Sequence, residues 1–217
     1  MSDDFQVMIF HVPRSRACCA CTRILLTPSS SGLCHRCHQE CTPLAYDPDA
    51  AIDGVFAYEG PLKAPLARLK YNRDVGIARM FADLLAPRIA RLARDAPIVV
   101  VPMPMSAGRR WRRGCNHTEL IAQWLPLRDL EIRLLPRGVL SRRHRPAQVG
   151  LSRTQRASNA AGAFTLHPHR SVMLRGTSVL ILDDVISTGS TMRACMNALR
   201  RSGASQLRGL ALLRRVA

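Results

Sequence analysis

The stretch of sequence that decides the fold is Val179-Leu180-Ile181-Leu182-Asp183-Asp184-Val185-Ile186-Ser187-Thr188-Gly189-Ser190-Thr191. Its first part is apolar and branched, which predicts a buried strand of a parallel sheet. Two adjacent carboxylates stand at the carboxyl end of this strand, and a short Ser/Thr/Gly loop then opens a helix. The apolar residues of that helix have the i, i+3, i+4, i+7 spacing of one buried face: Met192, Cys195, Met196 and Leu199.

This order of elements predicts a ligand site. Ligands of an open α/β sheet bind beyond the carboxyl ends of its strands, and the free N–H groups at a helix N-terminus attract anions. Carboxylates beside such a terminus suit sugar hydroxyls or a metal ion. The stretch therefore predicts a phosphorylated sugar as ligand, in preference to an ordinary strand–turn–helix whose Asp pair only caps the helix. The chain has no G-x-x-x-x-G-K-[ST] motif, so a P-loop is excluded. It also has no G-x-G-x-x-G motif after a strand.

Size and charge narrow the class of protein. The chain has 217 residues, 47% of them hydrophobic, which suffices for one core of about 150 residues and a small appendage. Its formal net charge is +17, from 32 Lys and Arg against 15 Asp and Glu. Such an excess predicts attraction to nucleic acid, phosphates or an anionic membrane face. The alternative is an arginine-rich genome, because the only lysines are Lys63 and Lys70.

The sequence also bears on location. No apolar run reaches the ~18 residues of a membrane span. The N-terminus carries Asp3 and Asp4 and has no basic segment of the kind that begins a signal peptide. We therefore expect a cytoplasmic protein, in which the eight cysteines are thiols or metal ligands instead of disulfides.

Six of these cysteines lie within residues 18–41. Two C-x-x-C pairs twelve residues apart have the form of a zinc ribbon, because each pair presents two thiolates and two pairs complete a tetrahedron. We expect a structural zinc ion in a cysteine-rich module over residues 1–45, held by Cys18, Cys21, Cys34 and Cys37. Cys19 in place of Cys18, and Cys41, His35 or His38 in place of Cys37, stay open as alternatives. A cluster of reduced thiols without metal is the other interpretation.

Residues 46–217 read as alternating strands and helices, which indicates a parallel sheet. Besides the opening stretch, we expect strands at 52–58, 98–101, 207–213 and, at the sheet edge, 132–135. The expected helices cover 63–70, 75–94 and 116–124. Pro87 is expected to bend or end the second helix, and Pro102 to break the strand before it. Residues 109–113 are expected to form a basic loop, and residues 137–156 are rich in arginine.

Several segments in this order resemble the ComF family (competence protein F, ComFC and GntX-like proteins), whose members join a phosphoribosyltransferase domain to an N-terminal zinc ribbon. Besides the cysteine pairs and residues 183–191, the resemblance rests on Leu69-Lys70, Val101-Pro102-Met103-Pro104, Arg113-Gly114-Cys115-Asn116-His117, Gln148, Leu151, Arg153, Arg156, Asn159 and Phe164. The chain departs from the family pattern where Cys115 replaces Phe, His117 replaces Gln, and Ser187-Thr188 replaces Thr-Thr.

The resemblance implies a type I phosphoribosyltransferase fold over residues 46–217, an α/β fold whose mainly parallel sheet is flanked by helices. It implies a site for phosphoribosyl pyrophosphate (PRPP) with Mg²⁺, in which Asp183 and Asp184 bind the ribose 2′ and 3′ hydroxyls. The 5′-phosphate would lie on the loop before the last helix. The full expected set is Asp183, Asp184, Ser187, Thr188, Gly189, Ser190 and Thr191. Purine-salvage enzymes carry a basic Asp at the position of Ser187, and because serine lacks a suitable pKa, ordinary purine salvage is disfavoured.

Cationic residues complete the expected sites. Lys70 and Arg113, together with Arg112, are candidates to stabilise a departing pyrophosphate. The resemblance places a mobile loop within residues 137–156, and arginines there and before it are candidates to track a nucleic-acid backbone. The nucleic-acid set is Arg109, Arg110, Arg112, Arg142, Arg143 and Arg145. Trp111 is a candidate to stack on bases, whereas the setting of Trp124 among Leu120, Ile121 and Leu125 indicates core.

Three functions follow as hypotheses. The favoured one is a ComF-type role in handling incoming single-stranded DNA during natural transformation, with DNA-uptake proteins at the inner membrane face as partners. The second is an active Mg²⁺-dependent phosphoribosyltransferase that uses PRPP and an unknown nitrogenous acceptor. The third is a regulatory sensor that binds a phosphoribosyl ligand and docks through the zinc module. The first two are compatible, because a fold does not fix a function.

Overall fold

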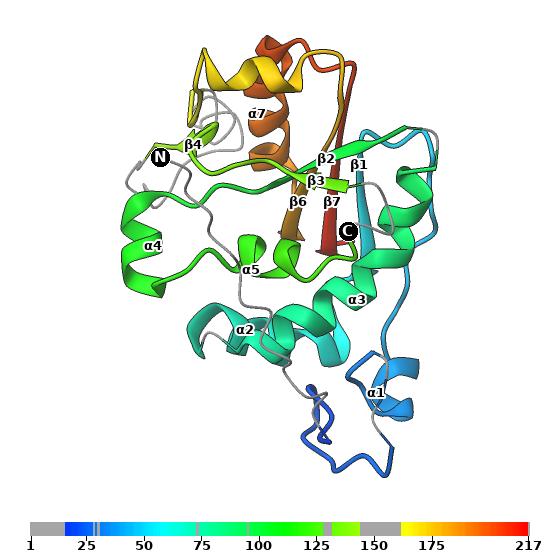
Figure 1. Ribbon diagram of the computed structural model, residues 1–217. Helices are drawn as coiled ribbons and strands as arrows, with labels where there is room; N and C mark the ends of the chain where they lie inside the picture. The colour runs from blue at the N-terminus through cyan, green and yellow to red at the C-terminus, as the bar shows by residue number, and fades with distance from the viewer. Residues whose placement is uncertain are drawn as a thin grey trace.

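A parallel sheet forms the centre of the molecule in the computed structural model (Figure 1). The structure describes residues 16–27, 29, 31–72, 74–94, 96–127, 132–143 and 162–216. Within these residues the sheet has five strands, in the order β1(Ile52–Ala57), β7(Gln206–Arg214), β6(Ser178–Ile186), β2(Ile98–Pro102) and β3(Ile132–Leu134). Every neighbouring pair is parallel. The expected α/β architecture and the edge position of β3 are confirmed.

Strand β6 lies between β7 and β2, and its side chains alternate between two cores. Val179 and Ile181 belong to the core on one face of the sheet. Leu180 and Leu182 belong to the core on the other face. This alternation is the period of two that any strand imposes on its side chains, and it explains why the run reads as continuously apolar.

Helices cover both faces of the sheet (Figure 1). The first face carries α2(Lys63–Asn72), α3(Val75–Leu92) and α5(His117–Gln123). The second carries α7(Ser190–Leu199) and the antiparallel pair β4(Leu140–Arg142) and β5(Phe164–Leu166). Shorter elements are α1(His35–Gln39), α4(Ala107–Arg113) and the 3-10 turns η1(Gly60–Leu62), η2(Arg170–Leu174) and η3(Arg200–Ser202).

Two prolines lie at or within elements. Pro87 lies inside α3 and does not end it, because the helix continues to Leu92. Strand β2 ends at Pro102, one residue beyond the expected end, and Pro102 is still in register with Leu182 of β6. The N-terminus of α3 follows the expected chemistry, because the Asp74 carboxylate accepts a hydrogen bond from the Ile77 N–H at 3.3 Å.

The expected basic loop at residues 109–113 is instead a helix, α4. Ser106 occupies the N-cap position, and Gly114 ends the helix with a left-handed φ of +72°, donating its N–H to the Arg110 carbonyl. A glycine adopts this conformation without strain, which is why it commonly follows the last helical turn. The helix was not predicted because four of its seven residues are arginines and none is buried, so it lacks the apolar face that marks a helix.

The hairpin of β4 and β5 was not expected either. Each strand has three residues, too few for a periodic signal. Residues 144–161, which the chain places between these strands, lie outside the described residues. The nucleic-acid candidate Arg145 and the family matches from Gln148 to Asn159 are therefore not placed.

The cysteine segment packs against the helices of the first face. Leu33, Cys37 and Cys41 are buried in the same core as Met80 of α3. Arg68 of α2 donates a hydrogen bond from Nη1 to the Cys19 carbonyl at 2.9 Å. The helices among the described residues include none that is long and apolar enough to cross a membrane.

Candidate functional site

A cavity of about 320 Å³ opens at the carboxyl edge of the sheet, where β2 and β6 end. Its lining comes from both faces of the sheet and from both halves of the chain. The polar and charged residues that line it are Lys70, Arg109, Arg113, Asn116, His117, Thr118, Arg142, Asp183, Asp184, Ser187, Ser190 and Thr191. Except for Thr188 and Arg112, the expected phosphorylated-sugar residues and the cations expected to stabilise pyrophosphate therefore share one cavity.

Asp184 is a buried acid that several groups of this cavity hold in place. It is 6% exposed, and its Oδ2 lies 2.5 Å from the Lys70 Nζ and 3.1 Å from the His117 Nε2. Its other oxygen, Oδ1, accepts a hydrogen bond from the Val185 N–H at 2.8 Å. Three separate elements thus hold one carboxylate at the end of β6.

The pKa values of the two adjacent acids are shifted in opposite directions. Burial and the neighbouring charge of Asp184 raise the pKa of Asp183 well above its ordinary value. Burial acts in the same direction on Asp184, but the hydrogen bond from His117 and the charge of Lys70 outweigh it and hold the pKa of Asp184 well below its ordinary value. Asp183 therefore holds its proton more readily than Asp184, which favours a hydrogen-bond donor at Asp183 beside an acceptor at Asp184.

The loop after β6 brings the N-terminus of α7 to the cavity. Gly189 is the N-cap residue of α7, with a left-handed φ of +72°. Ser187, Gly189, Ser190 and Thr191 line the cavity. Thr188 is not part of this lining, and its hydroxyl oxygen accepts a hydrogen bond from the Ser190 N–H at 3.4 Å. The N–H groups of the first turn of α7 are positioned to receive an anion.

Four cations surround the acidic pair. Lys70, Arg109, Arg113 and Arg142 all line the cavity. Arg113 stacks over Tyr71 at 5.5 Å, and Arg142 stacks over Phe164 at 5.4 Å. Burial and the charge of Arg109 lower the pKa of Arg142, while the charge of Asp183 raises it. Positive charge thus exceeds negative charge in the cavity, which suits a ligand with several phosphate charges.

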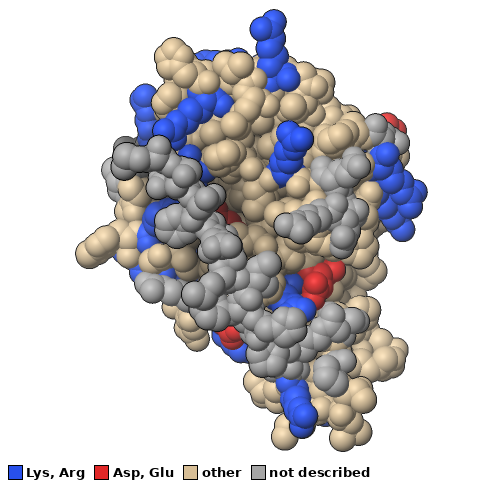
Figure 2. All heavy atoms as spheres, in the orientation of Figure 1, with Lys and Arg blue, Asp and Glu red and all other residues tan. Residues whose placement is uncertain are grey.

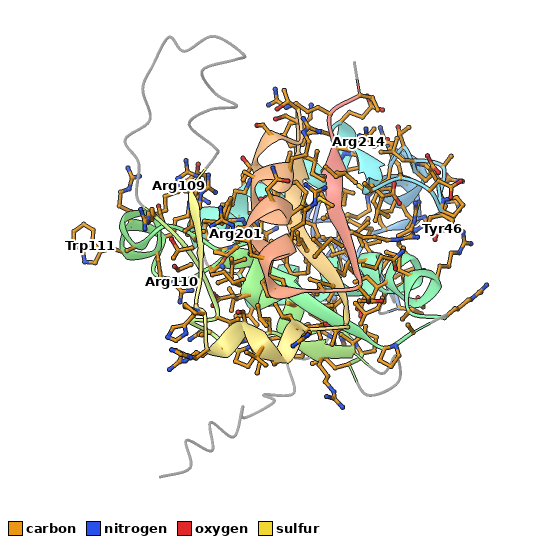
Figure 3. The ribbon with its side chains drawn as sticks, turned by 90° about the horizontal axis from the view of Figure 1, so that it is seen from above. Tyr46, Arg109, Arg110, Trp111, Arg201 and Arg214 are labelled. Atoms are coloured by element: carbon orange, nitrogen blue, oxygen red, sulfur yellow. The ribbon has the colours of Figure 1, made fainter. Side chains whose placement is uncertain are left out.

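The expected nucleic-acid residues are divided between α4 and β4. Arg109 and Arg112 are exposed on α4, and Trp111 between them is 86% exposed and points away from the body of the molecule (Figure 3). Arg110 is different, because it forms an ion pair with Glu119, which also binds Arg137. Trp124 packs against the core as expected.

Two neighbouring nucleic-acid candidates, Arg142 at the end of β4 and Arg143 directly after it, face different surroundings. Arg142 lines the cavity, whereas the neighbouring Arg143 does not and donates from Nε to the Thr165 hydroxyl at 3.1 Å. Successive side chains of a strand point to opposite sides, so the hairpin separates the two arginines.

His117 is the site residue that sequence reasoning missed. It is 7% exposed, and its Nδ1 has no hydrogen-bond partner among the described residues. The sequence marked it only as a departure from the glutamine of the ComF pattern. No local signal links it to Asp184, which lies 67 positions further along the chain (184 − 117). The link arises because α5 begins beside the end of β6.

The expected metal ligands form one cluster. The Sγ atoms of Cys18, Cys21, Cys34 and Cys37 all lie within 4.8 Å of one another. The Sγ atoms of Cys21 and Cys34 are 3.8 Å apart, which matches the edge of a tetrahedron of sulfurs at about 2.3 Å from a zinc ion, roughly 3.8 Å. The donor set and its spacing therefore fit zinc.

The alternatives to this ligand set do not join the cluster. Cys19, Cys41, His35 and His38 are not among the grouped residues. Cys41 instead donates a hydrogen bond from its thiol to the Cys37 carbonyl at 3.2 Å. Its part in the segment is thus packing beside the cluster.

The known proteins to which this chain is similar share a phosphoribosyl transferase domain or are named for competence or DNA utilization. The phosphoribosyl transferase domain matches residues 127–217. Competence protein F of Haemophilus influenzae is 34% identical over 167 residues, which cover 72% of this chain and 69% of that protein. DNA utilization protein YhgH of Escherichia coli K12 is 30% identical over 185 residues, with 83% and 77% covered. Competence protein ComFC of Bacillus subtilis is 24% identical over 151 residues, with 69% and 58% covered.

Proposed function

Because the chain belongs to the ComF family of proteins with a phosphoribosyltransferase domain, we propose that it binds PRPP or a related phosphoribosyl ligand and handles incoming single-stranded DNA during natural transformation. Both activities would take place in the cytoplasm, where DNA-uptake proteins at the inner membrane face would deliver the strand. The two parts of the proposal rest on different observations and are tested separately.

The observation that carries the ligand is the meeting of Asp183 and Asp184 with the N-terminus of α7 in one cavity. The acids suit the ribose hydroxyls, and the amides of the first turn suit the 5′-phosphate. Lys70, Arg109, Arg113 and Arg142 surround the space that remains and suit a pyrophosphate group. Mg²⁺ would be held mainly by the ligand's own phosphate oxygens, where it neutralises part of their charge.

Titration calorimetry with Mg²⁺–PRPP tests this part of the proposal. We expect a single site in the wild-type chain and loss of binding in Asp184→Asn. Asp49→Asn, at an exposed acid of the loop before β1, serves as the control and should bind as the wild type does. Absence of PRPP binding by a folded wild-type chain would overturn the ligand assignment.

The names of the relatives, the net charge and the surface of α4 all support DNA handling. The relatives include proteins named for competence and for DNA utilization, and the chain carries a net charge of +17. Helix α4 exposes Arg109, Trp111 and Arg112 together. Exposed arginines and an aromatic ring are the groups with which proteins hold single strands, through phosphate contacts and base stacking.

Fluorescence anisotropy of a labelled single-stranded oligonucleotide over a salt series tests this second part. We expect binding whose log–log slope against salt is negative, because each phosphate contact releases condensed counterions. Trp111→Ala should weaken binding, since base stacking is worth about 1–3 kcal/mol per base. Arg133→Ala, at an exposed residue of the edge strand β3, is the matched control for surface charge. No binding at low salt would end the DNA role and leave the ligand proposal intact.

A second candidate function is phosphoribosyl transfer to an unknown nitrogenous acceptor. It is favoured by Lys70 and Arg113, which line the same cavity as the acids and suit the charge that develops on a departing pyrophosphate. The acceptor nitrogen would form a bond to ribose C1 while the bond from C1 to the pyrophosphate oxygen breaks. Release of pyrophosphate from PRPP in the presence of candidate bases, and its loss in Asp184→Asn, would support transfer. Binding without release would limit the site to ligand binding.

A further inference from the structure

A second basic groove runs along α7, beside the cavity at the end of β6. It encloses about 880 Å³ between α7 and the β4–β5 hairpin. Arg143 contributes from the hairpin, and Arg193 and Arg201 contribute from α7 and the turn that follows it. Figure 3 shows Arg201 between α7 and β5. Neither Arg193 nor Arg201 was expected to take part in binding.

The groove follows one face of α7. The residues that line it are spaced at i, i+3, i+4, i+7, i+8 and i+11, namely Ser190, Arg193, Ala194, Asn197, Ala198 and Arg201. The face opposite is buried and apolar. The two alanines leave room between the longer polar side chains. Arg193 and Arg201 are eight residues apart, about 12 Å along a helix, so they do not compete for one phosphate.

The charge of the groove has one sign. Its lining among the described residues contains three arginines and no Asp or Glu. Arg193, Asn197 and Arg201 are exposed. Figure 2 shows Lys and Arg side chains gathered over the part of the molecule where α7 and the hairpin lie, without an acidic side chain coloured among them. A groove of this kind attracts a polyanion.

The groove adjoins the ligand cavity. Ser190 lines both spaces. Arg193 also donates a hydrogen bond to the Thr188 carbonyl, so a groove residue holds the loop at the start of α7. On the hairpin, Arg142 faces the cavity and Arg143 lines the groove. A chain bound along α7 would therefore pass directly beside the phosphoribosyl site.

From the charge, the amphipathic spacing and the shared Ser190, we infer that the α7 groove holds the sugar–phosphate backbone of single-stranded DNA. The inference rests on the proposed function, since it gives the strand a path from the cavity along α7. Arg143 and Arg201 contact phosphates, and the hairpin forms the opposite wall. A channel that is walled on both sides admits one backbone, whereas a duplex presents two.

The test is anisotropy of a labelled oligothymidylate with the full-length chain, over a salt series. Removing both arginines in Arg143→Ala/Arg201→Ala should reduce the negative log–log salt slope by about 1.4, because a single-strand contact contributes about 0.7. The conservative Arg143→Lys/Arg201→Lys keeps the charge and should retain most of the slope. Arg133→Ala, on β3 and away from the groove, should change the slope by no more than about 0.7, the value for one contact. Calorimetry should show unchanged PRPP binding in all three variants.

The outcomes separate the groove from the proposed function. If the wild-type chain binds no single strand, the DNA role itself fails. If the wild type binds and Arg143→Ala/Arg201→Ala binds with the same slope, the groove is wrong while the DNA role stands. A duplex that binds as tightly as the single strand, with the same loss in the double variant, would overturn the assignment to single strands.

Discussion

Asp184 gathers two partners that are far apart in sequence, Lys70 and His117, and none of the three is well exposed. A buried group that loses its partner costs about 1–3 kcal/mol. We therefore expect Asp184→Asn to lower the free energy of unfolding by about that amount, besides abolishing PRPP binding. Urea denaturation measures the first effect. His117→Gln keeps a donor for the Asp184 carboxylate, so it should be less destabilising than His117→Ala. Equal stability of these two histidine variants would contradict the hydrogen bond's role.

The raised pKa of Asp183 makes the stability of the chain depend on pH. Burial and the charge of Asp184 raise the pKa of Asp183, whereas the unfolded chain ionises this group near its ordinary pKa of about 3.9. Above that pH the folded state binds more protons than the unfolded state, so the contribution of Asp183 to stability falls as pH rises. Asp183→Asn removes this term.

We accordingly expect the stability of Asp183→Asn relative to the wild type to increase as the pH is raised from 4 to 7, by up to about 1.4 kcal/mol per pH unit. Thermal unfolding of both chains without Mg²⁺ or ligand measures the difference. A difference that stays constant with pH would show that Asp183 ionises normally in the folded chain.

At the scale of elements, Gly189 and Gly176 form a natural pair of test positions. Their φ values are +72° and +71°, but a Cβ at Gly189 would lie 2.9 Å from the Arg193 Nη1, while a Cβ at Gly176 would meet nothing within 4 Å. Both substitutions to alanine should cost about 1–2 kcal/mol for the left-handed backbone. Only Gly189→Ala should also weaken PRPP binding, because its Cβ would displace the Arg193 guanidinium from the Thr188 carbonyl and so loosen the loop at the start of α7. Equal affinities would remove this loop from the site.

The cysteine cluster predicts one zinc ion per chain. Cys21→Ser breaks the set of four thiolates and should release the metal, because three remaining sulfurs no longer close the tetrahedron. Cys41→Ala changes a buried cysteine outside the cluster and should keep the metal. Elemental analysis of the purified chains measures the zinc content. A full zinc content in Cys21→Ser would assign the ligands differently.

For the whole molecule, the packing of the cysteine segment on α3 predicts that loss of zinc lowers the thermal stability of the entire chain. Leu33 and Cys37 share a core with Met80 and Phe81. Removing the metal with a chelator should therefore lower the melting temperature of the entire chain in a single transition, instead of unfolding residues 1–45 alone. Calorimetry of the chain before and after chelation measures this. Two separate transitions would show that the expected boundary near residue 45 divides two independent units.

The sequence was sufficient for features that are local. The strand, acids and helix around residues 179–199 and the cysteine pairs could be predicted, because each is a pattern within one or two elements. The partners of Asp184 could not, since Lys70 and His117 meet it only through the packing of α2 and α5. Helix α4 was missed although Gly114 marks its end, because its arginines conceal any apolar face. Arg193 of α7 and Arg201 of the following turn have helical spacing, but only the apolar, buried face of this helix was used to predict its role.

Because side chains alternate along β6, its two acids face different layers of the protein. Asp184 is held by α2 and α5, which precede the strand, whereas Asp183 lies near Arg142 and Cys195 of the hairpin and α7. A substitution on one layer of the protein thus acts first on one acid and reaches the other through the interaction between the two carboxyls. For a lineage of related proteins, this arrangement ties the two positions together: a change of role at one carboxyl also shifts the pKa of its neighbour, so we expect the two positions to evolve jointly.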